Sequence, residues 1–412
     1  MPSAVVDAMT PLERRAGVSL AAIFALRMLG LFLVLPVFAV FAKTIPGGDD
    51  LTLVGIAIGA YGLTQACLQI PFGMASDRIG RKPVIVFGLI LFALGSVVAA
   101  LAHDIHGIII GRILQGAGAI SAAVTALAAD LTRDQHRTKV MAMIGSSIGL
   151  VFAVSLVLAP VLYAGVGMAG IFWLTAGLAL AALGMILFVV PQGPPLPKGV
   201  SGKFLEVIRN GQLMRLNFGV FVLHAMQTAM WVRIPSALVT TGGIGVADHW
   251  KVYLPAVLAS FLVMVPAIIA AERRGKLKPI FMLAIGLLIL VQAGLNLFGS
   301  GLWPLATLIA LFFVGFNILE ATQPSWISRV APPQSKGAAL GVYNTLQSLG
   351  LFFGGAVGGW IAKEWGSGAV SFFCGTLAIC WLIASFGLLA PVRRTTADGG
   401  RSVMDASNPR AA

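Results

Sequence analysis

Charged residues are scarce in this sequence. Only 10% of its 412 residues are charged, whereas 58% are hydrophobic. An average soluble domain contains about a quarter of charged residues. The composition therefore excludes a soluble globular protein and indicates a chain that lies largely within a lipid bilayer.

Cysteine and the residue clusters of catalytic sites are scarce too. The three cysteines, Cys67, Cys374 and Cys380, fall inside apolar runs, and no Cys/His spacing suggests a metal site. The sequence also offers no nucleophile–base pair and no phosphate-binding loop. We therefore expect no disulfide framework, no enzyme activity, no cofactor and no ATP-driven pump.

Long apolar runs are abundant. A membrane-spanning helix needs about 20 mostly apolar residues, and twelve such runs fall into two sets of six. The first set lies near residues 18–41, 51–74, 83–102, 106–129, 140–164 and 168–190. The second lies near residues 215–240, 249–271, 279–299, 302–328, 337–362 and 368–390. The sequence predicts an all-α membrane protein with twelve transmembrane helices in two six-helix bundles.

Five regions follow from these runs. They are an N-terminus (1–17), a first bundle (18–190), a linker (191–214), a second bundle (215–390) and a tail expected to be disordered (391–412). The first run is too long for the core of a signal peptide and lacks a cleavage site, so we expect it to be retained. Within the linker, residues 204–209 are amphipathic and are expected to lie along the inner membrane surface.

The basic residues predict the orientation. Lys and Arg favour cytoplasmic loops, and 22 of the 28 basic residues fall in loops or termini on one side of the predicted membrane. Lys43, Lys251 and Lys363 fall on the other side, and three lie within spans. Both termini and the linker are therefore predicted to be cytoplasmic. The net charge of +13 then needs no nucleic acid partner.

The two sets of runs are predicted to be repeats, because each second-half run starts about 195–200 residues after its counterpart. The loop from Asp77 to Pro83 has an echo from Glu272 to Pro279, with acid, base, glycine, bases and proline in the same order. Chance similarity of two basic loops is the alternative. Shared order and offset favour two bundles related by pseudo-two-fold symmetry.

The loop GMASDRIGRK at residues 73–82 resembles the signature of the major facilitator superfamily, G-x-x-x-D-R-x-G-R-K/R. The matching residues are Gly73, Asp77, Arg78, Gly80, Arg81 and Lys82. The runs LRMLGLFLVLPVF, GIAIGAYGLTQA and GRILQGAGAISAAV resemble the YajR branch of that family. The resemblance implies two bundles that rock about a central cavity in a bacterial inner membrane, and activity similar to proton-coupled drug exporters.

Asp77 lies at the C-terminal end of the second helix, where the helix dipole disfavours a carboxylate. It needs Arg78, Arg81 or a helix N-terminus, and the resemblance suggests the eleventh helix, beginning near Gly337. That contact would join the two halves and hold one conformation. The alternative is a tight turn made possible by Gly80.

Asp130 is expected to extend this conformational motif. It precedes two arginines, and we predict that it pairs with Arg133, Arg137 or Arg78. A solvated loop network is the alternative.

Arg112 is a cation within the fourth span, in a GRILQG run that resembles a second family motif. A charge at a helix centre costs about 2.5–3.5 kcal/mol on insertion scales, so it must face the interior. The resemblance implies a role in proton coupling. A structural arginine bonded to carbonyls of neighbouring helices is the alternative.

Glu320 is the only acid well inside a span. A carboxyl group in a cavity of low dielectric constant can load and unload a proton near neutral pH. The alternative is a fixed ion pair with Arg27 or Arg112. His224, in the seventh span, suits a proton relay, and it occupies about the position that Arg27 holds in the first repeat.

Polar residues at helical spacing predict the lining of a central cavity. One face of the seventh span carries His224, Gln227, Thr228 and Trp231 at i, i+3, i+4 and i+7. The other predicted lining residues are Arg27, Tyr61, Gln65, Gln115, Asn317, Asn344 and Gln347. Hydrogen bonding between helices is the alternative for each face.

Two transport functions fit this pattern. The first is proton-coupled efflux of small amphipathic or drug-like compounds by a monomer, with H⁺ as coupling ion. A partial match to an exporter signature in the fifth span, with Gly145 and Gly149, favours it. The alternative is proton-coupled transport of small organic anions, with Arg27 and Arg112 binding the substrate charge.

Overall fold

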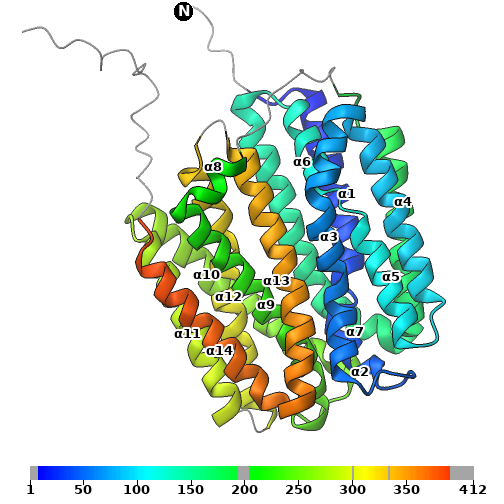
Figure 1. Cartoon of the computed structure of the whole chain (residues 1–412), viewed down its shortest axis with the longest axis vertical. Helices are drawn as coiled ribbons and strands as arrows, with labels where there is room; N and C mark the ends of the chain where they lie inside the picture. Colours follow the sequence, from blue (N-terminus) through cyan, green and yellow to red (C-terminus); the bar gives the residue numbers. More distant parts are fainter. Residues whose placement is uncertain (1–7, 194–203, 299–300, 333–334, 390–412) are drawn as a thin grey trace, which may run out of the picture.

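The computed structural model describes residues 8–193, 204–298, 301–332 and 335–389, and its regular structure there is entirely helical. Long helices stand side by side in two groups that follow the order of the chain (Figure 1). The first group comprises α1 (Pro11–Phe32), α2 (Leu35–Ala42), α3 (Leu51–Ile79), α4 (Arg81–Ala100), α5 (Ile105–Ala117), α6 (Ser121–Asp130), α7 (Asp134–Gly184) and the π-helix η1 (Met185–Val189). The second comprises α8 (Phe204–Arg209), α9 (Gly211–Thr240), the 3₁₀-helix η2 (Val246–Asp248), α10 (Trp250–Arg273), α11 (Leu277–Leu297), α12 (Leu302–Val330), α13 (Lys336–Trp365) and α14 (Ser367–Phe386).

Nine helical stretches among the described residues are long and apolar enough to cross a membrane. One of them, Lys139–Val189, has 51 residues and holds two spans, which meet where Gly167 adopts a left-handed backbone conformation (φ 68°). Helices α9 and α13 have 30 residues each, enough to cross a membrane, but their polar residues keep them out of the nine. With these, the chain is an all-α membrane protein of twelve transmembrane helices, as the sequence predicts.

The fourth predicted span is a broken helix. Helix α5 ends at Ala117, the backbone of the next residue, Gly118, leaves the helical region (φ −75°, ψ 51°), and α6 begins at Ser121. Such a break leaves carbonyl groups that no intrahelical N–H can reach. The first span is interrupted as well, between α1 and α2, where Pro36 lies in the first turn of α2.

Helix α1 begins at Pro11, earlier than the predicted start at residue 18. Thr10 and Glu13 form a capping box, in which each side chain accepts the other's backbone N–H at 3.2 and 2.8 Å. The Glu13 carboxylate also accepts a hydrogen bond from Arg133 Nε at 2.9 Å. The start of α1 is thereby tied to the connection between α6 and α7.

The last helix of the first half is held by two cations from that half. Arg15 Nε donates to the Val189 carbonyl at 2.9 Å, and Lys82 Nζ donates to the Val190 carbonyl at 2.6 Å. These carbonyls belong to the C-terminal end of a helix, where backbone acceptors lack partners and the dipole favours cations. The cations therefore cap that helix end.

The second half repeats these caps about 200 residues later. Arg215 Nη1 donates to the Gly387 carbonyl at 2.7 Å, and Lys278 Nζ donates to the Leu388 carbonyl at 2.8 Å. Corresponding residues thus make corresponding bonds, as expected for two halves related by pseudo-two-fold symmetry. We call the end of the molecule that carries these four cations the basic end, and the other the opposite end.

The two halves meet along a seam between α3 and α13, which lie side by side in Figure 1. A Cβ built on Gly55 would lie 1.9 Å from the Gly355 carbonyl oxygen, and one built on Gly59 would lie 2.8 Å from the Phe352 Cα. Next to this seam at the opposite end, Lys363 Nζ pairs with Asp50 Oδ2 at 2.8 Å. Small residues let the two backbones touch.

The seam does not continue to the basic end. A Cβ built on Gly337 or Gly341 of α13 meets no atom within 4 Å, and one built on Gly73 of α3 meets only Ala122 of its own half. The close backbone contact between α3 and α13 is therefore found toward the opposite end and not at these three glycines.

Candidate functional site

Three helices of the second half bring Glu320, His224 and Gln347 together. The His224 Nε2 atom lies 3.5 Å from Glu320 Oε2 and 2.7 Å from Gln347 Nε2, and Gln347 Nε2 also donates to Glu320 Oε1 at 3.4 Å. The Glu320 side chain is 36% exposed, while that of His224 is buried. The predicted alternative of an ion pair between Glu320 and Arg27 or Arg112 is wrong, since its partner is a histidine and both arginines bind elsewhere.

The hydrogen bonds of His224 define where a proton can sit. Its Nδ1 lies 3.0 Å from the Val220 carbonyl oxygen, which can only accept, so Nδ1 carries a hydrogen. In the neutral ring Nε2 is then an unprotonated acceptor beside a carboxylate. One proton on either group converts two acceptors into a hydrogen-bonded or ionic pair. The cluster therefore places an imidazole acceptor and a carboxylate side by side.

The rest of the predicted face of α9 extends from this cluster toward the opposite end. The Thr228 hydroxyl donates to the His224 carbonyl at 3.0 Å. Gln227 and Trp231 line a small pocket with Tyr253 of α10 and Phe312 of α12. The indole N–H of Trp231 and the hydroxyl of Tyr253 are buried and have no hydrogen-bond partner among the described residues.

Asn317 and Asn344 complete the predicted lining in the second half. Asn317 Nδ2 donates to Ser260 Oγ at 2.8 Å, which links α12 to α10. Both asparagines are partly exposed. Their role in a cavity stays a prediction.

Arg27 is fully buried in the first half. Its guanidinium donates to the Gly118 carbonyl at 3.0 Å and to Gln65 Oε1 at 3.4 Å, and it lies over the rings of Tyr61 and Phe92. The Gly118 carbonyl is free to accept because the helix breaks there. Arg27, Tyr61 and Gln65 thus form one packed cluster and do not face an open cavity in this conformation.

Arg112 is buried beside that cluster. It donates to the carbonyls of Ala57 and Ile58 at 3.3 and 3.2 Å and to Gln115 Oε1 at 2.9 Å, while Gln115 donates to Ser96 Oγ at 2.8 Å. These contacts are those of the structural arginine that the sequence left as an alternative. Coupling by Arg112 stays a prediction.

The signature loop forms a charge cluster at the basic end. Arg81 pairs with Asp77, donates to Asp130 Oδ2 at 3.0 Å and donates to Ser76 Oγ at 2.9 Å. Gly80 joins α3 to α4 with φ 106°, a conformation that glycine adopts readily. The carboxylates of two helices are thus bridged by one guanidinium.

One predicted pair in this cluster is observed, and the predicted partners of Asp130 are not. The Asp77 side chain is 62% exposed and pairs with Arg81, one of its predicted partners, and not with the start of α13. Asp130 pairs with Arg81, which was not among its predicted partners, while Arg133 pairs with Glu13. Arg137 donates to the Ala129 carbonyl at 3.3 Å. In the loop that echoes this motif, the side chains of Glu272 and Arg273 lie outside the described residues.

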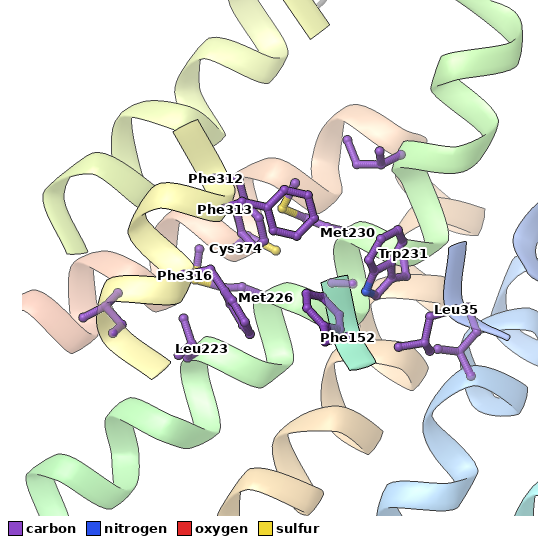
Figure 2. Packing of buried hydrophobic residues seen from close by; sticks show 14 of the residues in the cluster. Leu35, Phe152, Leu223, Met226, Met230, Trp231, Phe312, Phe313, Phe316 and Cys374 are labelled. Atoms are coloured by element: carbon purple, nitrogen blue, oxygen red, sulfur yellow. The ribbon is translucent and has the colours of Figure 1, made fainter. Parts of the chain in front are cut away.

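An aromatic and methionine cluster between the halves was not predicted. The ring of Phe152, from α7 of the first half, lies 6.1 and 6.2 Å from those of Phe313 and Phe316 of α12. Figure 2 shows Met226 and Met230 of α9 beside these rings. The spacing of Phe312, Phe313 and Phe316 could have indicated one aromatic face of α12, but the partner from α7 lies more than 150 residues away in sequence.

Two bundles of six helices, closed at one end around buried polar clusters, define a multi-pass membrane transporter. A family model described as Major Facilitator Superfamily matches residues 20–354, and the chain belongs to that superfamily.

Similar proteins agree with this assignment. The chain is 45% identical to "Inner membrane transport protein YajR" of Escherichia coli over 388 residues, which cover 93% of this chain and 85% of that protein. It is 29% identical to "Multidrug resistance protein MdtH" of Cronobacter sakazakii over 363 residues, covering 81% and 83% of the two chains. A solved structure of a D-xylose-proton symporter matches with a TM-score of 0.72 and 14% identity, covering 91% and 98%, which supports the fold alone.

Proposed function

We propose that the chain is a secondary active transporter that exports small amphipathic compounds in exchange for protons by alternating access. The observation that carries the proposal is the cluster of Glu320, His224 and Gln347. A carboxylate and an imidazole lie side by side there within membrane-spanning helices, and the Glu320 side chain is 36% exposed, which supports exchange of a proton at this place. H⁺ is the proposed coupling ion.

The two ends of the molecule supply the alternating access. We propose that the basic end faces the cytoplasm of a bacterium and that the chain lies in its inner membrane with both termini inside. The structure then has the external side closed by the α3–α13 seam. In the other state the seam opens and the cytoplasmic ends of α3 and α13 approach, which brings the α13 start toward Asp77.

The aromatic and methionine cluster supports amphipathic substrates. Methionine is flexible and polarizable and adapts to ligands of different shape, and flat rings offer apolar contact area. The MdtH relative is named a multidrug resistance protein, which agrees with export of such compounds. The organic anion alternative has less support, because Arg27 and Arg112 already donate to protein acceptors and are buried.

Proton flux in proteoliposomes tests the proposal. The protein is reconstituted as a monomer, a pH gradient is imposed, and candidate substrates, both cationic dyes and carboxylates, are added. The right substrate should dissipate the gradient, and Glu320→Gln should abolish this effect.

The matched control is Glu364→Gln, which removes an exposed carboxylate at the opposite end and should leave coupling intact. Both variants are first compared with the wild type for thermal stability. Unchanged coupling of substrate to proton flux in a folded Glu320→Gln variant would contradict the assignment of Glu320 as the proton carrier. Dissipation by carboxylates and not by dyes would favour the anion function instead.

A further inference from the structure

A groove runs along the outside of the first half at the basic end, between α1 and η1. It has a volume of about 610 Å³ and is lined by Met9, Pro11, Arg14, Arg15, Val18, Ser19, Met185 and Val189. Two guanidinium groups thus stand beside a mainly apolar channel. This groove is separate from the Glu320 cluster and takes no part in the function proposed above.

Helix capping explains one of these two arginines. Arg15 Nε holds the Val189 carbonyl, as Arg215 holds Gly387 in the other half. Arg14 does not cap a helix end, since its side chain makes no hydrogen bond or ion pair with any described residue. Its counterpart in the second repeat is Met214, so the repeat does not require a cation at this place.

The surroundings of the groove are those of a lipid-facing surface. Leu12, Val18 and Phe188 are 53%, 52% and 81% exposed although they are apolar. They belong to or adjoin helices that are long and apolar enough to span a membrane. In a bilayer, an exposed apolar wall on a spanning helix contacts acyl chains, and arginines in the first two turns of such a helix reach toward the headgroups.

We infer that this groove binds an anionic phospholipid. Arg14 and the free Nη atoms of Arg15 hold the headgroup phosphate, and one acyl chain follows Val18, Met185 and Val189. A guanidinium presents paired N–H groups that match phosphate oxygens. Basic pockets between transmembrane helices at the cytoplasmic side recognise anionic headgroups in this way. A lipid without net charge would make the apolar contacts but would lack the net attraction between an anionic headgroup and the two arginines.

Native mass spectrometry of the full chain tests the inference. The protein in a neutral detergent is titrated with phosphatidylglycerol or with phosphatidylcholine of the same acyl chains. Phosphatidylglycerol should bind at least fivefold more tightly. Arg14→Met should weaken phosphatidylglycerol binding by about fivefold, the effect of one arginine near an anionic headgroup, and leave phosphatidylcholine unchanged.

Three further measurements make the test decisive. Arg274→Met, which removes an exposed arginine of the basic end outside the groove, should leave binding unchanged. Arg14→Lys should keep most of the phosphatidylglycerol binding. Val18→Glu, which places a carboxylate in the groove, should weaken this binding, and it tests the inference even if Arg14→Met does not fold. Equal loss in Arg274→Met would mean attraction by overall charge alone. Competition by millimolar inorganic phosphate would mean a free-anion site, and either result overturns the inference.

Discussion

The Gly55→Ala substitution tests whether backbone contact in the α3–α13 seam closes the opposite end. The added Cβ would lie 1.9 Å from the Gly355 oxygen, 2.8 Å from the Gly355 carbon and 3.0 Å from the Gly359 Cα. All three are backbone atoms that no rotamer change can move. Since an ordinary carbon–oxygen contact is about 3.4 Å, the helices must separate by about 1–1.5 Å.

The energy of this clash sets the size of the expected shift. Overpacking of a close contact costs about 1–3 kcal/mol, which corresponds to a change of about 5–150-fold in the ratio of closed to open states. Alanine also favours the helix itself by up to about 1 kcal/mol, so the fold should survive. We therefore expect a stable protein in which the opposite end opens more often.

Spin labels on α3 and α13 near the opposite end measure the result. Pulsed electron–electron double resonance should show a second, longer distance between the labels in Gly55→Ala that is rare in the wild type. Gly341→Ala, on α13, is the matched control, because a Cβ built on Gly341 meets no atom within 4 Å. This variant should keep the wild-type distribution of spin-label distances. A Gly55→Ala variant with wild-type distances would refute the idea that the seam holds this end closed.

Three other predictions follow from the charges and buried bonds. The hydrogen bond from Lys363 holds the pKa of Asp50 below its ordinary value, so this ion pair stabilises the closed opposite end fully above the ordinary carboxyl pKa and loses that effect as the pH falls through the lowered pKa. The spin-label distances should therefore be constant near neutral pH and lengthen only in acid. Asp50→Asn should remove this pH dependence. Arg112→Gln should lower the free energy of unfolding by about 1 kcal/mol, because two interhelical hydrogen bonds of about 0.6 kcal/mol each are lost. A thermal melt in detergent measures this, with Arg209→Gln, which changes an exposed side chain of α8, as the control. Asp77→Asn should slow turnover more than it weakens substrate binding, and a variant that loses binding while keeping its turnover rate would make Asp77 a binding residue.

The fold could be predicted from sequence to the extent that it depends on properties local to the chain. Hydrophobic length predicted the twelve spans, and the order of charges around Gly80 and Gly275 predicted the repeat. The break at Gly118 was missed, because an apolar run looks the same whether its helix is continuous or interrupted. The early start of α1 was missed because the capping box of Thr10 and Glu13 lies before the apolar residues.

The partners of the polar residues were harder to predict. Glu320 and His224 each stood out as a polar group in an apolar span, yet their pairing depends on how α9 and α12 pack, which hydrophobicity does not specify. Asp130 illustrates the same limit, since its partner is Arg81, whereas Arg133, Arg137 and Arg78 were predicted. A charge in a span must find a partner, but only the tertiary contacts decide which.

The cationic caps at the basic end have a consequence for the motion of the two halves. In each half, one cation from the first membrane span and one from the third donate hydrogen bonds to carbonyls at the end of the sixth span, so residues of the same bundle connect its first, third and sixth spans. Rotation of one bundle against the other leaves all four hydrogen bonds intact. In the proposed alternating access, the contacts that change are then those between the halves, where α3 meets α13, α7 meets α10 and α2 meets α9. Substitutions there should alter how often the molecule turns over without loosening either bundle.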